Sequence, residues 1–404
     1  MVWLAYRVRA ARVAAWVAAW VAAWVAADAC HDAPVPHRAR LILAVTFTLA
    51  VLMAACEPAG SASPLVGSPG PPTIPPTATV WTVHAIPGKA VIRRWHIATN
   101  GSIFVVASGD DGVLQPVRPQ FWISTDRIAW NRIDIDQGIH GTVTALSATP
   151  TGFVAFVFDD GPRDAIILTS ADGRSWARQG PLPKAASARG GGVEGTIRAA
   201  DGVLAVGATA GGGLAAWHSG DGKVWIPLNA PTPGGIGGPR AVVAVAAGYA
   251  AVGAGNGVEA AWTSADGAVW TPATIKPGAP PGSVMLAVAK GPKGSLLAVG
   301  GGADPTRVIA WASADGMAWR PLDGAPADSA WRTVVAGRDG WIVLGNRGPT
   351  GTAWRTVDGT DWTPLQVPVG VALFDDAVVV DGRLVAVGND STGYSSFVIV
   401  EGPL

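Results

Sequence analysis

The stretch Ala260-Ala261-Trp262-Thr263-Ser264-Ala265-Asp266-Gly267-Ala268-Val269-Trp270 recurs along this chain with small changes. Further copies centre on Ser170-Ala171-Asp172-Gly173, Ser219-Gly220-Asp221-Gly222, Ser313-Ala314-Asp315-Gly316 and Thr356-Val357-Asp358-Gly359, and a degenerate copy lies at Ser124-Thr125-Asp126-Arg127. An internal repeat of this kind predicts an architecture built by stacking one structural unit many times.

The repeated phrase is typical of a β-hairpin, because Asp-Gly lies between two apolar runs. Five of the six copies also carry two tryptophans eight residues apart: Trp122/Trp130, Trp217/Trp225, Trp262/Trp270, Trp311/Trp319 and Trp354/Trp362. The remaining copy keeps Trp176 and has Leu168 at the first position. A three-residue loop at 265–267 would make Trp262 and Trp270 direct cross-strand partners, and we expect that form. The Ser and Asp side chains are expected to hydrogen-bond the turn backbone.

The phrase Ser-x-Asp-Gly-x-x-Trp resembles a shortened Asp-box of the bacterial neuraminidase (BNR) repeats. The usual pattern there is Ser-x-Asp-x-Gly-x-Thr-Trp, with one more residue between Asp and Gly. Through repetition the resemblance covers about residues 80–404, and in that family the box is a turn in a β-propeller blade of enzymes and non-enzymes alike. It therefore implies a fold and a structural role for the box residues, without implying catalysis. These residues are Ser170, Asp172, Gly173, Trp176, Ser219, Asp221, Gly222, Trp225, Ser264, Asp266, Gly267, Trp270, Ser313, Asp315, Gly316, Trp319, Asp358, Gly359 and Trp362.

Each repeat holds four short strand signals, such as 241–245, 249–252, 259–262 and 269–271. The second and third signals occur seven times, whereas the fourth, with its Trp, follows only six of them. Residues 79–84 resemble the missing fourth strand. We therefore expect an all-β, seven-bladed β-propeller of four-stranded antiparallel blades, closed by pairing about 79–84 with about 396–400. Six blades with a loose terminal unit and an open β-solenoid are the alternatives.

The residues before the repeats predict export and anchoring. Residues 1–36 form an extension of doubtful origin, either a short apolar helix or sequence upstream of the true start. Residues 37–56 read as a signal peptide with a basic start, an apolar run and Met53-Ala54-Ala55-Cys56, which resembles a bacterial lipobox. That resemblance implies lipidation of Cys56, and an ordinary signal or anchor helix is the alternative. Residues 57–78 read as a Pro/Ser-rich tether and 79–404 as the propeller, held on the outer face of a bacterial cell membrane.

Composition and motifs argue against several functions. Only 14% of the 404 residues are charged and the net charge is zero, so nucleic-acid binding has no electrostatic support. The histidines lack metal-ligand spacing, the glycine runs lack the spacing of a phosphate loop, and no serine has a partnered histidine in sequence. We expect no metal, no cofactor and no catalytic residue.

A propeller's central channel gathers the residues that open its innermost strands. The repeats place these near Arg93, His140, Glu194, Arg240, Ser283, Trp331 and Asp375, which differ from blade to blade. This predicts a ligand site at the channel mouth of a monomeric, non-catalytic cell-surface binding or scaffold lipoprotein, with an unknown protein, peptide or glycan as partner.

Two other functions stay open. A sialidase-type glycoside hydrolase would need arginines and two carboxylates clustered beside Tyr249 or Tyr394, the tyrosines of the repeat region. A membrane-complex assembly factor is suggested by fold analogy alone.

Overall fold

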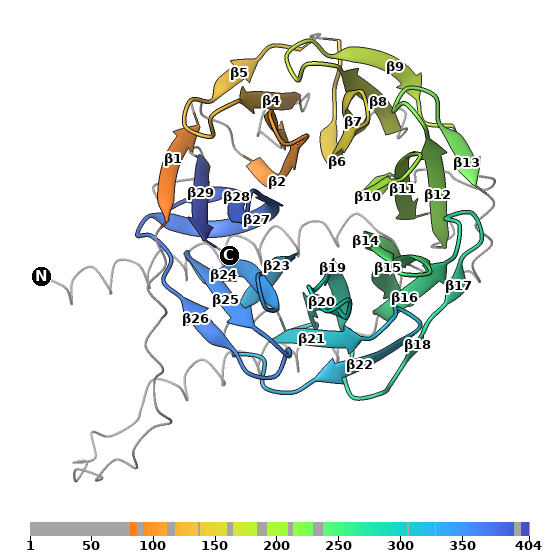
Figure 1. Cartoon of the computed structure of the whole chain (residues 1–404), viewed down its shortest axis with the longest axis vertical. Helices are drawn as coiled ribbons and strands as arrows, with labels where there is room; N and C mark the ends of the chain where they lie inside the picture. Colours follow the sequence, from red (N-terminus) through yellow and green to blue (C-terminus); the bar gives the residue numbers. More distant parts are fainter. Residues whose placement is uncertain are drawn as a thin grey trace, which may run out of the picture. The chain divides into compact units, whose positions relative to one another are not determined.

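A computed structural model describes residues 81–86, 92–110, 118–135, 138–159, 165–183, 192–208, 213–228, 237–304, 307–327, 329–391 and 397–403. Their strands form seven sheets. Figure 1 shows these sheets arranged around a common axis, with one strand of each lying innermost.

The strands occupy four positions from the axis outward. Innermost are β2 (Ile92–Thr99), β6 (Thr142–Thr149), β10 (Val193–Ala199), β14 (Gly237–Val245), β19 (Val284–Lys290), β23 (Ala330–Ala336) and β27 (Val371–Val380). Second are β3 (Phe104–Asp110), β7 (Gly152–Phe158), β11 (Gly202–Ala208), β15 (Gly248–Gly255), β20 (Leu296–Gly301), β24 (Trp341–Arg347) and β28 (Arg383–Asp390). Third are β4 (Pro119–Ser124), β8 (Ala165–Ser170), β12 (Leu214–Ser219), β16 (Val258–Ser264), β21 (Val308–Ser313), β25 (Thr350–Thr356) and β29 (Phe397–Pro403). Outermost are β5 (Asn131–Ile133), β9 (Ala177–Pro181), β13 (Ile226–Leu228), β17 (Thr271–Pro272), β22 (Ala318–Leu322), β26 (Thr363–Leu365) and β1 (Thr82–Ile86).

The first and last strands of the described chain lie in one sheet. β1 pairs antiparallel with β29, in a register that runs from Thr82 opposite Glu401 to Ile86 opposite Phe397. This sheet also contacts the one that follows β1 in the chain, because the Ile97 N–H donates to Asp376 Oδ2 at 3.1 Å. Hydrogen bonds along the strands and between the sheets thus join the two ends of the described chain.

The predicted fold class needs correction in its details. The sheets are not uniformly four-stranded, because β18 (Thr274–Ile275) adds a fifth strand that lies parallel to β22. It joins through the backbone, with Thr274 N donating to Met317 O at 2.9 Å. The strands β1 and β29 also have other bounds than 79–84 and 396–400, and residues 79 and 80 lie outside the described part.

The core lies between the sheets. Seven apolar clusters each combine side chains from two neighbouring sheets; one joins Val154 and Phe156 to Val203, Ala205 and Trp217. A sheet that is buried on both faces reads as a continuous apolar run, which explains the Ala- and Val-rich second and third strands. Burial of these faces, at roughly 25 cal/mol per Å² of apolar surface, is the main favourable term in folding.

The repeated phrase forms a tight outer turn. Ser264 Oγ accepts a hydrogen bond from Gly267 N at 2.8 Å, and Asp266 Oδ1 accepts from Ala268 N at 2.8 Å and Val269 N at 3.1 Å. Trp270 Nε1 donates to the Gly267 carbonyl at 2.7 Å. Gly267 has φ 80°, and a Cβ there would lie 3.0 Å from Leu204 of the preceding sheet, so glycine suits both the turn and the packing.

The predicted three-residue loop is wrong. β16 ends at Ser264 and β17 begins at Thr271, so Trp262 lies opposite Pro272 and not opposite Trp270. The reason is the Asp266 carboxylate, which binds the N–H groups two and three residues further on and so extends the turn to Trp270. The two tryptophans still belong to one apolar cluster.

The turn aspartates are stabilised in their charged form. Backbone N–H donors lower the pKa of five of them: Asp126, Asp172, Asp221, Asp266 and Asp358. A carboxylate with a lowered pKa contributes stability above its unfolded-state pKa, and that contribution is lost as the pH falls through the folded-state value. The repeated turns therefore weaken together in acid.

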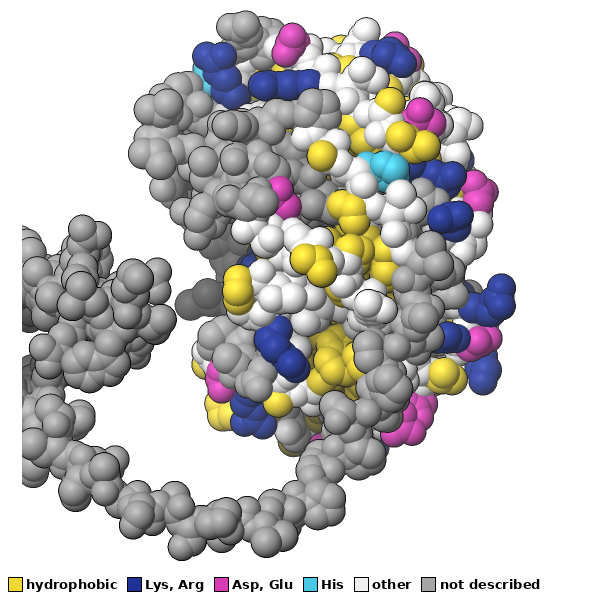
Figure 2. All heavy atoms as spheres, turned by 90° about the vertical axis from the view of Figure 1, so that its left-hand side faces the viewer, with side chains coloured by type: hydrophobic (Ala, Val, Ile, Leu, Met, Phe, Trp, Pro, Cys, Tyr) yellow, Lys and Arg dark blue, Asp and Glu magenta, His cyan; other side chains and the backbone are white. Residues whose placement is uncertain are grey.

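The outer surface is mixed in charge. Figure 2 shows basic and acidic side chains interspersed on the face it presents, without one large patch of a single sign. Among the described residues no helix is long and apolar enough to cross a membrane.

Replacing Ser264 by alanine should lower the free energy of unfolding by about 1–3 kcal/mol, because the buried Gly267 N–H loses its acceptor. Urea unfolding followed by tryptophan fluorescence would measure the change. Val269→Ala is the matched control, since Val269 lies in the same turn with 57% of its surface exposed. Equal effects from both substitutions would contradict the structural role of the serine.

Candidate functional site

Every innermost strand carries a β-bulge. In each sheet the register between the innermost and second strands shifts, so that the innermost strand has at least one residue without a partner. A bulge of this kind re-aims a side chain and leaves it outside the ladder. The unpaired residues are Arg93 and Arg94 in β2, Ala372 and Asp375 in β27, and one residue in each other innermost strand: Thr144, Glu194, Arg240, Leu286 and Arg332.

The repeated Val-Gly at the end of the second strand accompanies the bulge. In β28, Gly388 lies opposite Phe374, and a Cβ on Gly388 would collide with the carbonyl oxygen of Leu373. The backbones of β27 and β28 thus approach closely at Phe374, the residue before the bulged Asp375. This glycine was the sequence signal that could have located the bulged residue.

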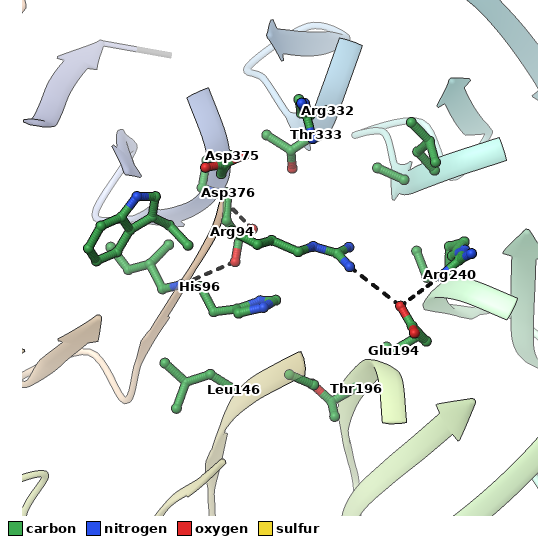
Figure 3. Close-up of a pocket in the computed structure, with 18 of the residues that line it drawn as sticks. Arg94, His96, Leu146, Glu194, Thr196, Arg240, Arg332, Thr333, Asp375 and Asp376 are labelled. Carbon is green, nitrogen blue, oxygen red and sulfur yellow. Dashed lines mark hydrogen bonds and ion pairs between the residues drawn. The ribbon is translucent and has the colours of Figure 1, made fainter. Parts of the chain in front are cut away.

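The bulges surround a cavity on the axis. It has a volume of about 270 Å³ and is lined by all seven innermost strands. Figure 3 shows its polar lining, in which Arg94, Arg240 and Arg332 come from three different sheets. Glu194, Asp375 and Asp376 are the carboxylates of this lining. The charges balance only when all three carboxylates are ionised, so the described lining is positive whenever one aspartate is protonated.

Two of the arginines share one carboxylate. Glu194 Oε2 lies 3.4 Å from Arg94 Nη1 and 3.0 Å from Arg240 Nη1. Arg94 extends from β2 across part of the cavity to reach it (Figure 3). The side chains of Arg94 and Arg240 are 46% and 44% exposed, whereas that of Glu194 is 22% exposed. Both guanidinium groups are therefore open to solvent while they share this carboxylate.

Arg332 is the third cation of the cavity. It is exposed on β23, and within the described residues no ion pair is found for it. Its guanidinium and that of Arg94 are the positive charges that act on Asp375.

Asp375 and Asp376 differ in their contacts. Asp376 Oδ2 accepts from Ile97 N across the sheet boundary, and its Oδ1 accepts from Ala377 N at 2.8 Å. Both oxygens of Asp375 are buried, and the backbone contact that favours its charged form is the Trp95 N–H, which lowers its pKa. Burial raises the pKa of Asp375 to about 7 and that of Asp376 to about 6. Burial thus favours the protonated acid of Asp375.

His96 is a neutral neighbour of these charges. It is buried on β2, where its ring faces the cavity in Figure 3, and its Nε2 has no partner within the described part of the chain. Burial, helped by the charge of Arg94, lowers the pKa of His96 to about 3. The imidazole therefore adds no charge to the cavity.

Some of the predicted site residues line the cavity and others do not. Glu194, Arg240 and Asp375 line the cavity. Trp331 is buried and packs against Trp362, with ring centroids 4.6 Å apart and ring planes 40° apart, while its neighbour Arg332 lines the cavity. His140 and Ser283 precede the strands β6 and β19 and are absent from the cavity lining.

The side chains of two further predicted residues, Arg93 and Cys56, lie outside the described part of the structure. Arg94, the neighbour of Arg93, lines the cavity. Sequence reasoning missed Arg94, His96, Arg332 and Asp376.

The chemistry of the cavity favours anions over metals. The described residues hold no group of three or more His, Cys, Asp or Glu side chains arranged to bind a metal ion. A larger hollow of about 620 Å³ lies beside β22, lined by turns that include Pro277, Pro280 and Pro326. The axial cavity differs from it in having buried ionisable groups, which are typical of functional sites.

Asp375→Asn should remove a pH dependence of stability. The folded protein binds the Asp375 proton more tightly than the unfolded chain, whose ordinary value is 3.8, so the free energy of unfolding falls as pH rises from about 4 to about 7. Relative to wild type, the variant should gain about 1–3 kcal/mol of stability between pH 4.5 and pH 8. Urea unfolding at both values checks this, with the exposed Asp339→Asn as control. A variant that gains no stability relative to wild type over this range would refute the assignment.

Comparison with known proteins supports the fold alone. No protein-family model and no curated protein matches the chain. Among solved structures, a catalytically inactive variant of virginiamycin B lyase from Staphylococcus aureus, solved with quinupristin, superposes with a TM-score of 0.57 at 9% identity, over 80% of this chain and 100% of that one. The periplasmic gluconolactonase of Pseudomonas aeruginosa gives 0.51 at 15% identity over 70% and 86%, and a protein from Lactobacillus plantarum gives 0.52 at 12% over 70% and 88%. The chain shares the β-propeller fold with these proteins.

Proposed function

We propose that this chain is a non-catalytic binding protein that holds a small anion, or an anionic group of a larger partner, in its axial cavity. The observation that carries the proposal is the convergence of Arg94, Arg240 and Arg332 from three sheets on one cavity. Guanidinium groups match carboxylates and phosphates in shape and charge, and they keep their charge at every physiological pH.

The size of the cavity limits the ligand. At about 270 Å³ it lies just below the usual range of pockets for drug-sized ligands, roughly 300–1,000 Å³. A carboxylate-bearing sugar, a small organic acid or a chain-terminal carboxylate fits this volume and the arginines. The glycan and peptide partners expected from sequence both include such groups.

We assign the repeated turns to the Asp-box class. The assignment is supported by the serine and aspartate acceptors and by the tryptophan N–H that closes the turn, as in Ser219, Asp221 and Trp225. We further place the protein on the outer face of a bacterial cell membrane, held by a lipid on Cys56 and a Pro/Ser-rich tether. This placement is supported by the sequence of residues 37–78.

A sialidase-type hydrolase is the less favoured alternative. The cavity has the arginines and carboxylates, but its described lining contains no tyrosine to act as a nucleophile. Tyr249 lies on β15 instead, near Asp201, and Tyr394 lies outside the described residues. Turnover in a broad screen of glycosides would overturn the non-catalytic proposal.

Glu194→Gln should tighten anion binding about threefold to tenfold, because it removes the carboxylate that competes for Arg94 and Arg240. Arg240→Gln should weaken binding by a similar factor. Isothermal titration with sulfate and with acetate at constant ionic strength measures both effects. Arg355→Gln is the control, since Arg355 pairs with Asp339 away from the cavity. If neither anion binds the wild type, the proposed function is wrong.

Cys56→Ser should abolish acylation in a bacterial host, because the thiol is the atom that would carry the lipid. Metabolic labelling with a fatty acid measures this. The matched control is Cys30→Ser, which changes the other cysteine of the sequence and should leave the label in place. Label that persists on the Cys56 variant would refute the lipid anchor.

A further inference from the structure

We propose that Asp375 is the proton-linked regulator of the axial site, and that it takes up a proton when an anion binds beside Arg94 and Arg332. This inference rests on the proposed anion-binding function and adds the regulation of that site. It is carried by the position of one carboxyl group that the structure leaves without the contacts given to its neighbour.

The first observation is the contrast between the two adjacent aspartates. Asp376 Oδ2 accepts a hydrogen bond from Ile97 N and so joins β27 to β2, and its Oδ1 accepts one from Ala377 N. Both Asp375 oxygens are buried, with the Trp95 backbone N–H as a nearby donor. An ionised carboxylate in such a place is costly unless neighbouring charges balance it. Asp375 is therefore retained where its charged form is costly.

The second observation is what surrounds Asp375. Among the described residues, the charged groups that act on Asp375 are Arg332 on β23, Arg94 on β2 and Asp376 on β27, and His96 lines the same cavity from β2. His96 stays neutral because burial lowers its pKa to about 3. Burial raises the pKa of Asp375 to about 7 and that of Asp376 to about 6, and two backbone N–H groups favour the charged form of Asp376. Because Asp376 is fixed by these two hydrogen bonds, we take Asp375 as the carboxyl group whose charge responds to the arginines.

The coupling follows from charge alone. An ionised Asp375 partly neutralises Arg94 and Arg332, the two cations that act on it most strongly. An anion bound beside the same arginines reduces their attraction for the ionised Asp375 carboxylate. It also repels that carboxylate directly. Both effects favour the protonated acid. By linkage, protonation must then strengthen anion binding to the same extent. The anion and the Asp375 charge therefore compete for the same two guanidinium groups.

The test uses sulfate, which keeps its charge of −2 throughout the range, and the full chain purified in detergent. The dissociation constant of wild type should rise about threefold to tenfold between pH 6.5 and pH 8.5. Titration at pH 8 in buffers of different ionisation enthalpy should show uptake of a substantial fraction of one proton per sulfate. This second readout requires no substitution.

Asp375→Asn supplies the matched variant, because its side chain is neutral at every pH. It should bind sulfate at pH 8.5 as tightly as wild type does at pH 6.5, and it should take up no proton. Asp339→Asn, outside the cavity, should behave like wild type.

The outcomes separate the two proposals. Sulfate binding that is independent of pH and of Asp375 would refute the regulator and leave the anion site standing. Failure of sulfate and acetate to bind at any pH would refute the anion site itself. A pH dependence that survives in Asp375→Asn would assign the proton to another group and also refute the regulator.

Discussion

The burial of each sheet between two others is the constraint on which this structure depends. The apolar clusters join neighbouring sheets, so no sheet has a complete core of its own. Sheets can come this close only if the facing side chains are small or interdigitate, which accounts for the abundance of Ala, Gly and Val between larger anchors such as Trp217 and Phe156. The outer turns serve the same constraint, since Gly267 packs against Leu204 of the neighbouring sheet.

The outer turns are nearly identical from sheet to sheet, whereas the residues that line the axial cavity differ. The hydrogen bonds of the outer turns repeat nearly unchanged from Ser219 to Ser264 and Ser313. Near the axis the bulged position holds an arginine, a threonine, a glutamate, a leucine or an aspartate, according to the sheet. The repeat thus supplies a rigid frame, and one or two positions on an innermost strand set the charge of the cavity. Sites built on strands in this way are held more rigidly than sites built on loops.

Sequence reasoning reached some of these features and missed others for physical reasons. The Asp-Gly phrase and its flanking apolar runs predicted all-β, antiparallel units in chain order, because turn chemistry and periodicity are local properties. The register of the Trp262 hairpin was wrong, because the Asp266 carboxylate captures two N–H groups that a tight loop would leave free. The sequence predicted Trp331 and not Arg332 as the cavity residue of this sheet. The bulge changes which of the two faces the cavity, and the pattern of apolar residues does not show where the bulge lies. The raised pKa of Asp375 depends on charges from other sheets, which no local pattern records.

The pairing of β1 with β29 has a consequence for how the chain folds. The partners Thr82 and Glu401 come from opposite ends of the repeat region, so this ladder forms only by closing a very long loop. Contacts of such sequence separation slow folding. While β1 and β29 are apart, the open edge of β29 presents unpaired backbone groups to any other chain, and such edges are prone to aggregation. A truncated chain that lacks β1, and with it the pairing of Thr82 with Glu401, would therefore be expected to associate with other copies of itself.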